Sequence, residues 1–121
     1  MGAGSVDGQP AVRPGTITFA KPDPTVGREQ AGWRPILVVS SAEYAEYIPD
    51  LVIAVPLTTR DRGLPHHIAV GGTDTGLKAP TWALCEQVRA VSTARLREAS
   101  GICDESTVTA VRAVIRRFLG A

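Results

Sequence analysis

Two apolar runs constrain the fold of this chain more than any other feature. The first reads I-L-V-V at 36–39, and the second reads L-V-I-A-V-P-L at 51–57. An unbroken apolar run of this length indicates a strand that is buried on both faces. The sequence therefore predicts a small core built around two buried strands, with polar loops leading into and out of them.

Weaker patterns of alternating or β-branched residues, bounded by turn formers, add further strands. The predicted strands span 16–20, 34–40, 51–57, 66–70 and 81–91, with a weak sixth near 98–103. Within 81–91 the alternation predicts inward side chains at Trp82, Leu84 and Val88, and partly exposed ones at Glu86, Gln87 and Arg89. Pro56 has no amide N–H, so it indicates an edge or a bulge in its strand.

The helices expected are a short one at 41–47, which begins at a capping serine, and a longer one at the C-terminus. Asp104 or Ser106 caps the second helix and Gly120 ends it. Its apolar face carries Val108, Val111, Ile115 and Phe118. Its arginines, Arg112, Arg116 and Arg117, fit a solvated face better than an RNA-binding one. Short strands followed by one helix predict a mainly β (α+β) fold with a strongly curved sheet or small barrel.

Length and composition limit the remaining possibilities. The 121 residues predict a single domain at 13–121, preceded by a flexible polar leader at 1–12. A net charge of +1 gives no global attraction for nucleic acid, so any such binding requires a local patch. Cys85 and Cys103 belong to no metal or disulfide motif. No apolar run is long enough to span a membrane, which predicts a cytoplasmic protein.

Few templates for catalysis fit this sequence. It contains no phosphate-binding glycine loop, HExxH motif or nucleophile elbow, and the adjacent His66 and His67 do not show ligand spacing. We therefore expect no metal and no cofactor. The remaining candidates are Glu29, Arg34 and the Thr58-Thr59-Arg60 group, which lie at the ends of neighbouring apolar runs.

The segment 23–40, D-P-T-V-G-R-E-Q-A-G-W-R-P-I-L-V-V-S, resembles the signature of the MazF/PemK family of toxin endoribonucleases. Three further blocks follow in the family's order. They are V-P-L-T-T-R at 55–60, L-P-H-H-I at 64–68 and A-L-C-E-Q-V-R-A-V at 83–91. The resemblance extends from about Gly15 to the end of the last helix.

The resemblance implies an SH3-like barrel of the MazF/PemK/CcdB toxin type that forms a homodimer. It also implies metal-independent cleavage of single-stranded RNA at a short sequence, inhibited by an acidic antitoxin of the MazE type. The substrate 2′-hydroxyl attacks the phosphate, leaving a 2′,3′-cyclic phosphate and a 5′-hydroxyl. Arg34 and Thr58 stand at the family's catalytic arginine and threonine.

The general base remains open, because either Glu29 or one of the two histidines has suitable chemistry. Trp33 fits either stacking on a base or packing at a dimer interface. The predicted RNA contacts are residues whose side chains offer charge or hydrogen bonds beside the site. They are Arg28, Gln30, Thr59, Arg60, His66, His67 and Gln87.

Some positions depart from the family pattern. Thr16 and Phe19 replace the usual acidic residue and tryptophan of the first strand, Lys21-Pro22 replaces an acidic-apolar pair, and Arg28 replaces a serine. These changes affect the expected cleavage specificity and leave Arg34 and Thr58 in place. Two rival functions remain, because a fold does not fix a function. One is a non-catalytic module that binds a protein such as a gyrase, and the other is an inactive RNA binder.

Overall fold

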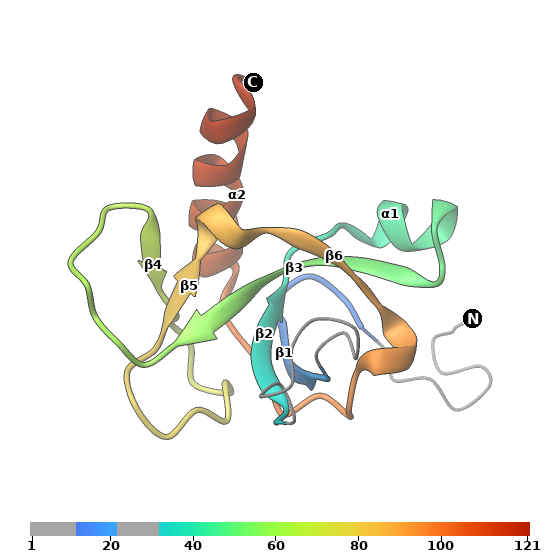
Figure 1. Cartoon of the computed structure of the whole chain (residues 1–121), viewed down its shortest axis with the longest axis horizontal. Helices are drawn as coiled ribbons and strands as arrows, with labels where there is room; N and C mark the ends of the chain where they lie inside the picture. The colour runs from blue at the N-terminus through green and yellow to red at the C-terminus, as the bar shows by residue number, and fades with distance from the viewer. Residues whose placement is uncertain (1–11, 22–31) are drawn as a thin grey trace.

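The computed structural model describes residues 12–21 and 32–121, and within them the protein is mainly β (Figure 1). The strands are β1 (Thr16–Ala20), β2 (Arg34–Val38), β3 (Leu51–Thr58), β4 (His67–Ala69), β5 (Trp82–Leu84), β6 (Arg89–Ser92) and β7 (Gly101–Ile102). The helices are α1 (Ala42–Tyr47), α2 (Glu105–Leu119) and the short 3₁₀ turns η2 (Cys85–Gln87) and η3 (Thr93–Arg95). The predicted mainly β fold with a C-terminal helix is confirmed.

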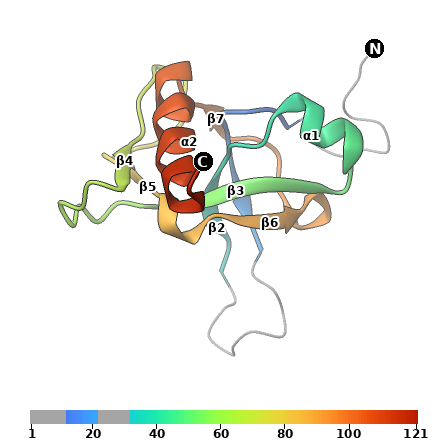
Figure 2. The same cartoon turned by 90° about the horizontal axis from the view of Figure 1, so that it is seen from above.

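The strands form one curled antiparallel sheet in the order β4-β5-β3-β2-β1-β7, and β6 also pairs with β3. The short helix α1 and the long helix α2 lie toward opposite ends of β3 (Figures 1 and 2). Ser41 caps α1 by accepting a hydrogen bond from the Tyr44 amide, as the sequence predicts. Strand β3 is thus an internal strand with three partners, and α2 packs beside the β4–β5 end of the sheet.

Each face of the sheet carries its own core, and the run at 36–39 contributes to both. Leu37 and Val39 belong to the larger core, which lies between the sheet and α2, while Ile36 and Val38 belong to the smaller one. Successive residues of a strand point to opposite faces. The prediction that this run is buried on both faces is therefore confirmed.

Pro56 lies inside β3, which is an internal strand rather than an edge. On one side Pro56 is in register with Ile36 of β2. On the other side it falls between Ala54, the last residue paired with β6, and Leu57, the first paired with β5. The expected edge is thus only a short gap in the ladder, where the missing amide N–H costs no strand pairing.

The single strand predicted at 81–91 is wrong, because the chain turns through η2 and divides into β5 and β6. The predicted inward residues are also out of phase. Ala83 and Cys85 are fully buried, whereas Trp82, Leu84 and Val88 are only partly buried. Both faces of β5 carry apolar residues, so the sequence does not show which alternate side chains point inward. A short 3₁₀ turn also has no strong sequence signal.

Helix α2 begins and ends where the sequence predicts. The Asp104 carboxylate accepts hydrogen bonds from the Thr107 amide and hydroxyl, and Gly120 ends the helix in the left-handed region at φ +80. Phe118 is 54% exposed, so its predicted place in the core is wrong. Arg112 is not fully solvated either, because its Nε donates to the Val39 carbonyl at 2.9 Å.

Both cysteines are buried free thiols, as expected, and burial raises the pKa of each to about 11. Neither helix among the described residues is long and apolar enough to cross a membrane. The predicted leader lies outside the described residues except for Val12, which packs against the smaller core. Its flexibility stays a prediction.

A close backbone contact joins β7 to the loop at 71–80. A Cβ atom placed on Gly101 would collide with the carbonyl of Thr75, whereas one placed on Gly32 would meet nothing within 4 Å. We therefore expect Gly101→Ala to lower the free energy of unfolding by about 1–3 kcal/mol, as overpacking does. Gly32→Ala is the control. Urea unfolding measures the stability of both variants. A Gly101→Ala variant as stable as the parent would contradict the contact.

The cap of α2 should make stability depend on pH. Hydrogen bonds from the Thr107 side chain and amide lower the pKa of Asp104 below its ordinary value. A lowered folded-state pKa contributes stability above the unfolded-state pKa of about 3.9, and this contribution is lost as pH falls through the folded value. Asp104→Ala should therefore lower the urea midpoint at pH 7, and the difference from the parent should narrow in acid.

The control for this cap is Asp50→Ala, which removes an exposed aspartate whose recorded hydrogen bonds involve its backbone carbonyl. This variant should follow the parent at each pH. If the urea midpoints of Asp104→Ala and the parent differed by the same amount from pH 7 to pH 3, the result would contradict the cap's electrostatic role.

Candidate active site

Arg34 and Thr58 lie at adjoining ends of two paired strands. Arg34 begins β2, and Thr58 ends β3. The two strands pair antiparallel with Ile36 opposite Pro56 and Val38 opposite Ala54. Continuing that register by two residues sets Arg34 opposite Thr58, on the same face of the sheet. The structure therefore brings together the two residues that the sequence predicts as catalytic.

The hydroxyl of Thr58 is held by a turn that follows β3. The Arg60 amide donates to Thr58 Oγ1 at 3.1 Å, and Trp82 of β5 pairs with Thr58 across the ladder. A hydroxyl that accepts one hydrogen bond keeps its own proton to donate. Thr58 is half-buried, while Arg34, Thr59 and Arg60 are exposed. The strand end thus presents cationic and hydroxyl donors on an open surface.

Trp33, which immediately precedes Arg34, makes cation–π contacts with side chains from two other segments. The Arg97 guanidinium lies 4.3 Å from the centre of the indole ring, and the Lys21 ammonium lies 5.9 Å from it. Arg97 is itself fixed to β1, because its amide donates to the Phe19 carbonyl and its carbonyl accepts from the Thr18 hydroxyl. These contacts connect the start of β2 both with β1 and with the segment that follows η3. No sequence pattern indicated this link.

The other predicted site residues are placed differently from one another. Glu29, Arg28 and Gln30 lie outside the described residues. Gln87 is exposed in η2 and His66 is half-buried, whereas His67 is buried. The His67 ring is therefore largely closed off from solvent, which makes it a poor contact for RNA.

Glu86 is a functional candidate that the sequence reasoning missed. Its carboxylate lies 3.3 Å from His67 Nε2 and 3.6 Å from His66 Nε2. Burial opposes ionisation most strongly, but hydrogen bonds from its own amide and from His67, with the two imidazoles nearby, outweigh it and lower the pKa of Glu86. The turn at η2 sets this carboxylate beside the histidines, so a pattern that assumed one strand could not reveal it.

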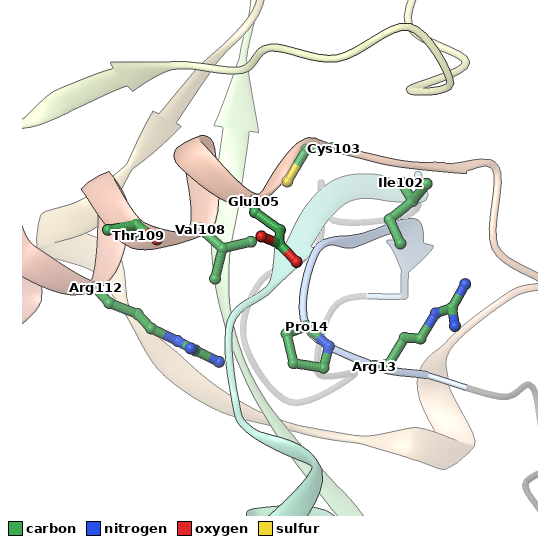
Figure 3. Close-up of a pocket in the computed structure, with 8 residues that line it drawn as sticks. All are labelled: Arg13, Pro14, Ile102, Cys103, Glu105, Val108, Thr109 and Arg112. Atoms are coloured by element: carbon green, nitrogen blue, oxygen red, sulfur yellow. The ribbon is translucent and has the colours of Figure 1, made fainter.

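A pocket of about 440 Å³ lies elsewhere, between the start of α2, β7 and the segment before β1 (Figure 3). Its lining residues are Arg13, Pro14, Ile102, Cys103, Glu105, Val108, Thr109 and Arg112. It contains none of the predicted site residues. A strand-end surface suits an extended polymer better than this hollow does, because a polymer must lie across its binding site.

A family model described as PemK-like, MazF-like toxin of type II toxin-antitoxin system matches residues 13–119. The chain belongs to this family. The resemblance seen in the sequence motifs is therefore confirmed, and it covers the β sheet and both helices of this MazF-like toxin.

Individual relatives agree with this family. Endoribonuclease EndoA of Bacillus subtilis is 30% identical over 88 residues, which cover 72% of this chain and 76% of the relative. Endoribonuclease MazF of Staphylococcus epidermidis is 26% identical over 110 residues, covering 90% and 92%. A chain of the MazE-MazF crystal structure (Form-II) from Deinococcus radiodurans superposes with a TM-score of 0.74 at 26% identity, covering 90% of this chain and 96% of that one. The expected toxin-type barrel fold is thus confirmed.

The contact between Arg97 and Trp33 can be tested by fluorescence. The chain has two tryptophans, so Trp82→Phe leaves Trp33 as the only tryptophan, which can be excited selectively over the tyrosines. In that background we expect Arg97→Ala to increase quenching of Trp33 by acrylamide and to lower stability by about 0.5–1 kcal/mol, as for an exposed cation–π pair. Arg117→Ala, which removes an exposed arginine of α2, should change neither. Unchanged quenching in Arg97→Ala would contradict the contact.

Proposed function

We propose that this chain is the toxin of a type II toxin–antitoxin pair and an endoribonuclease that cleaves single-stranded RNA. The observation that carries the proposal is the placement of Arg34 and Thr58 at adjoining ends of β2 and β3 in a chain of the MazF-like family. The names of its relatives from B. subtilis and S. epidermidis include the same activity. The toxin domain spans 13–121, and the leader at 1–12 lies outside it.

The proposed reaction depends mainly on positively charged and hydrogen-bonding side chains at the phosphate, and it uses no cofactor. The substrate 2′-oxygen bonds to phosphorus, the bond to the 5′-oxygen breaks, and the products carry a 2′,3′-cyclic phosphate and a 5′-hydroxyl. Arg34 donates two hydrogen bonds to non-bridging oxygens, since its planar guanidinium matches them and stays charged. Thr58 donates its remaining hydroxyl proton to the same phosphate and so stabilises the negative charge of the transition state.

Two protons must move during cleavage. A base takes the proton of the 2′-hydroxyl, and an acid returns one to the leaving 5′-oxygen. We assign the base to Glu29, because it is the carboxylate of the loop that leads into Arg34. The buried ring of His67 is poorly placed for this role. His66 is the alternative base, since it is half-buried rather than enclosed.

Specificity comes from side chains around the strand ends. We assign RNA contacts to Arg28 and Gln30 of the preceding loop, to Thr59 and Arg60 after β3, and to Gln87 of η2. Thr59, Arg60 and Gln87 are exposed and offer charge or amide groups suited to phosphates and unstacked bases. His66 stands at the margin of this set, and His67 is left out of it because its ring is buried.

The proposal also includes partners and location. The toxin acts as a homodimer in the cytoplasm, and a MazE-like antitoxin with an acidic segment covers its RNA surface. A solved MazE-MazF complex from D. radiodurans, whose matched chain is 26% identical to this one, supports such a partner. An acidic segment complements the cationic end of β2 and competes directly with the RNA phosphates.

The decisive experiment measures cleavage of a mixed-sequence single-stranded RNA by the purified protein in EDTA. Arg34→Ala and Thr58→Val should each lower kcat/KM by about 10²–10³-fold, the usual loss when one donor to a transition-state oxyanion is removed. Arg34→Lys keeps the charge but not the two-pronged geometry, so it should recover only part of the activity.

Arg117→Ala is the matched control, because it removes an arginine of α2 and should leave cleavage unchanged. The products should end in 2′,3′-cyclic phosphate and 5′-hydroxyl. No cleavage by the parent, or full activity in both site variants, would overturn the proposal. Salt-dependent RNA binding without products would instead support an inactive RNA binder.

A further inference from the structure

Three potential metal ligands meet at the β4 edge of the sheet, outside the Arg34–Thr58 pair. They are His66, His67 and Glu86, and their ligand atoms lie within 4.8 Å of one another. Both imidazoles direct Nε2 at the same carboxylate, with separations of 3.6 Å for His66 and 3.3 Å for His67. The proposed cleavage reaction uses neither His67 nor Glu86 and has His66 only as the alternative base, so it does not explain why the three side chains converge.

Adjacent residues of a strand point to opposite faces, so two neighbouring histidines rarely share a ligand. Here the exception has a structural cause, because β4 begins at His67 and His66 belongs to the turn before it. The two rings stand edge to face with centroids 4.8 Å apart. Phe118 of α2 also packs edge to face with His66, with ring centroids 5.9 Å apart. The pair is thus oriented by packing before any ligand arrives.

We propose that His66, His67 and Glu86 form a binding site for a divalent transition-metal ion of the Zn²⁺ type. Two imidazoles and a carboxylate are a ligand set that Zn²⁺ accepts, with bonds of about 2.0–2.2 Å. Tetrahedral geometry with such bonds sets neighbouring ligand atoms about 3.3–3.6 Å apart. The separations from His67 Nε2 to Glu86 Oε2 (3.3 Å) and from His66 Nε2 to Glu86 Oε1 (3.6 Å) fall in this range. With one ligand atom from each residue, all three atoms lie within 4.8 Å of one another, so small side-chain rotations close the set around an ion.

The surroundings of the cluster also suit a bound cation. The side chains of His66 and Glu86 are 31% and 38% exposed, whereas that of His67 is 3% exposed. One ligand is therefore anchored in the interior and two face solvent, which leaves access for the ion and for water in the fourth position. Glu86 supplies a carboxylate that faces both imidazoles.

The geometry also limits the affinity. A metal-bound histidine usually donates its second ring N–H to a neighbouring acceptor, and loss of that partner costs 10–100-fold in affinity. Among the described residues, buried His67 Nδ1 has no hydrogen-bond partner. We therefore expect an affinity about 10–100-fold below that of a site whose histidines are all held by a second hydrogen bond.

A bound ion would add a link between the start of β4 and the turn η2, beyond the ladder that pairs His67 of β4 with Leu84 of β5. His66 ends the connection after β3, His67 begins β4, and Glu86 lies in η2 between β5 and β6. Binding to the folded chain stabilises it by mass action. Zn²⁺ should thus raise the melting temperature of the toxin without being required for its chemistry.

The test is calorimetric titration of ZnCl₂ into the full chain without a polyhistidine tag, after removal of metal with a chelator. We expect one ion per chain. Glu86→Gln and His66→Gln alter the solvent-facing ligands, so both variants should fold, and each should weaken Zn²⁺ binding by at least about 10-fold. Glu98→Gln, an exposed glutamate outside the cluster, is the control and should bind like the parent.

A second measurement reports the ligand geometry directly. Co²⁺ bound in a tetrahedral site absorbs visible light far more strongly than hexaaqua Co²⁺, and Zn²⁺ should displace it. Absence of saturable Zn²⁺ binding, or equal affinity in parent, Glu86→Gln and His66→Gln, would overturn the site. Neither result depends on RNA cleavage in EDTA, so failure of this site and failure of the proposed nuclease function are distinguishable.

Discussion

The three-way pairing of β3 is the constraint on which the rest of the structure depends. One edge of β3 pairs with β2, and the other pairs first with β6 and then with β5. Along the strand, Val52 and Ala54 enter the smaller core, while Val55 and Leu57 enter the larger one. A shift of one residue in register would exchange these sets and move Thr58 off the face of Arg34. The same burial that fixes the sheet thus fixes the candidate site.

The change of partner along β3 also explains why the site is open. Pro56 falls in the gap where β6 has ended and β5 has not begun, so it cannot extend either ladder. Two residues later the strand ends, and the Arg60 amide folds back onto the Thr58 hydroxyl. A site placed at the end of a buried strand is held more firmly than one on a free loop. Its donors nevertheless remain at the surface, where a polymer has access.

Periodicity and capping chemistry predicted the elements whose signals are local. The β-branched pattern of β1 and the Asp104 and Gly120 caps of α2 belong to this class. The sequence does not predict the turn at η2, because the apolar residues on both sides of it show no clear alternation of apolar and polar positions. Arg34 and Thr58 came from resemblance and not from spacing. The contacts of Glu86 with the histidines and of Arg97 with Trp33 join distant segments, and only the tertiary fold could reveal them.

The contact of Arg97 with Trp33 bears on how a nearly neutral protein can attract RNA. Because the net charge is only +1, the electrostatic field that attracts RNA must come from a local arrangement of positively charged side chains. A carboxylate partner would order an arginine but would also cancel its charge. An indole ring attracts the guanidinium through its quadrupole and carries no net charge. Arg97 lies 4.3 Å above Trp33, the residue before Arg34, and no salt bridge within residues 12–21 and 32–121 cancels its charge. Its ordered positive charge therefore suits a surface that must hold a polyanion.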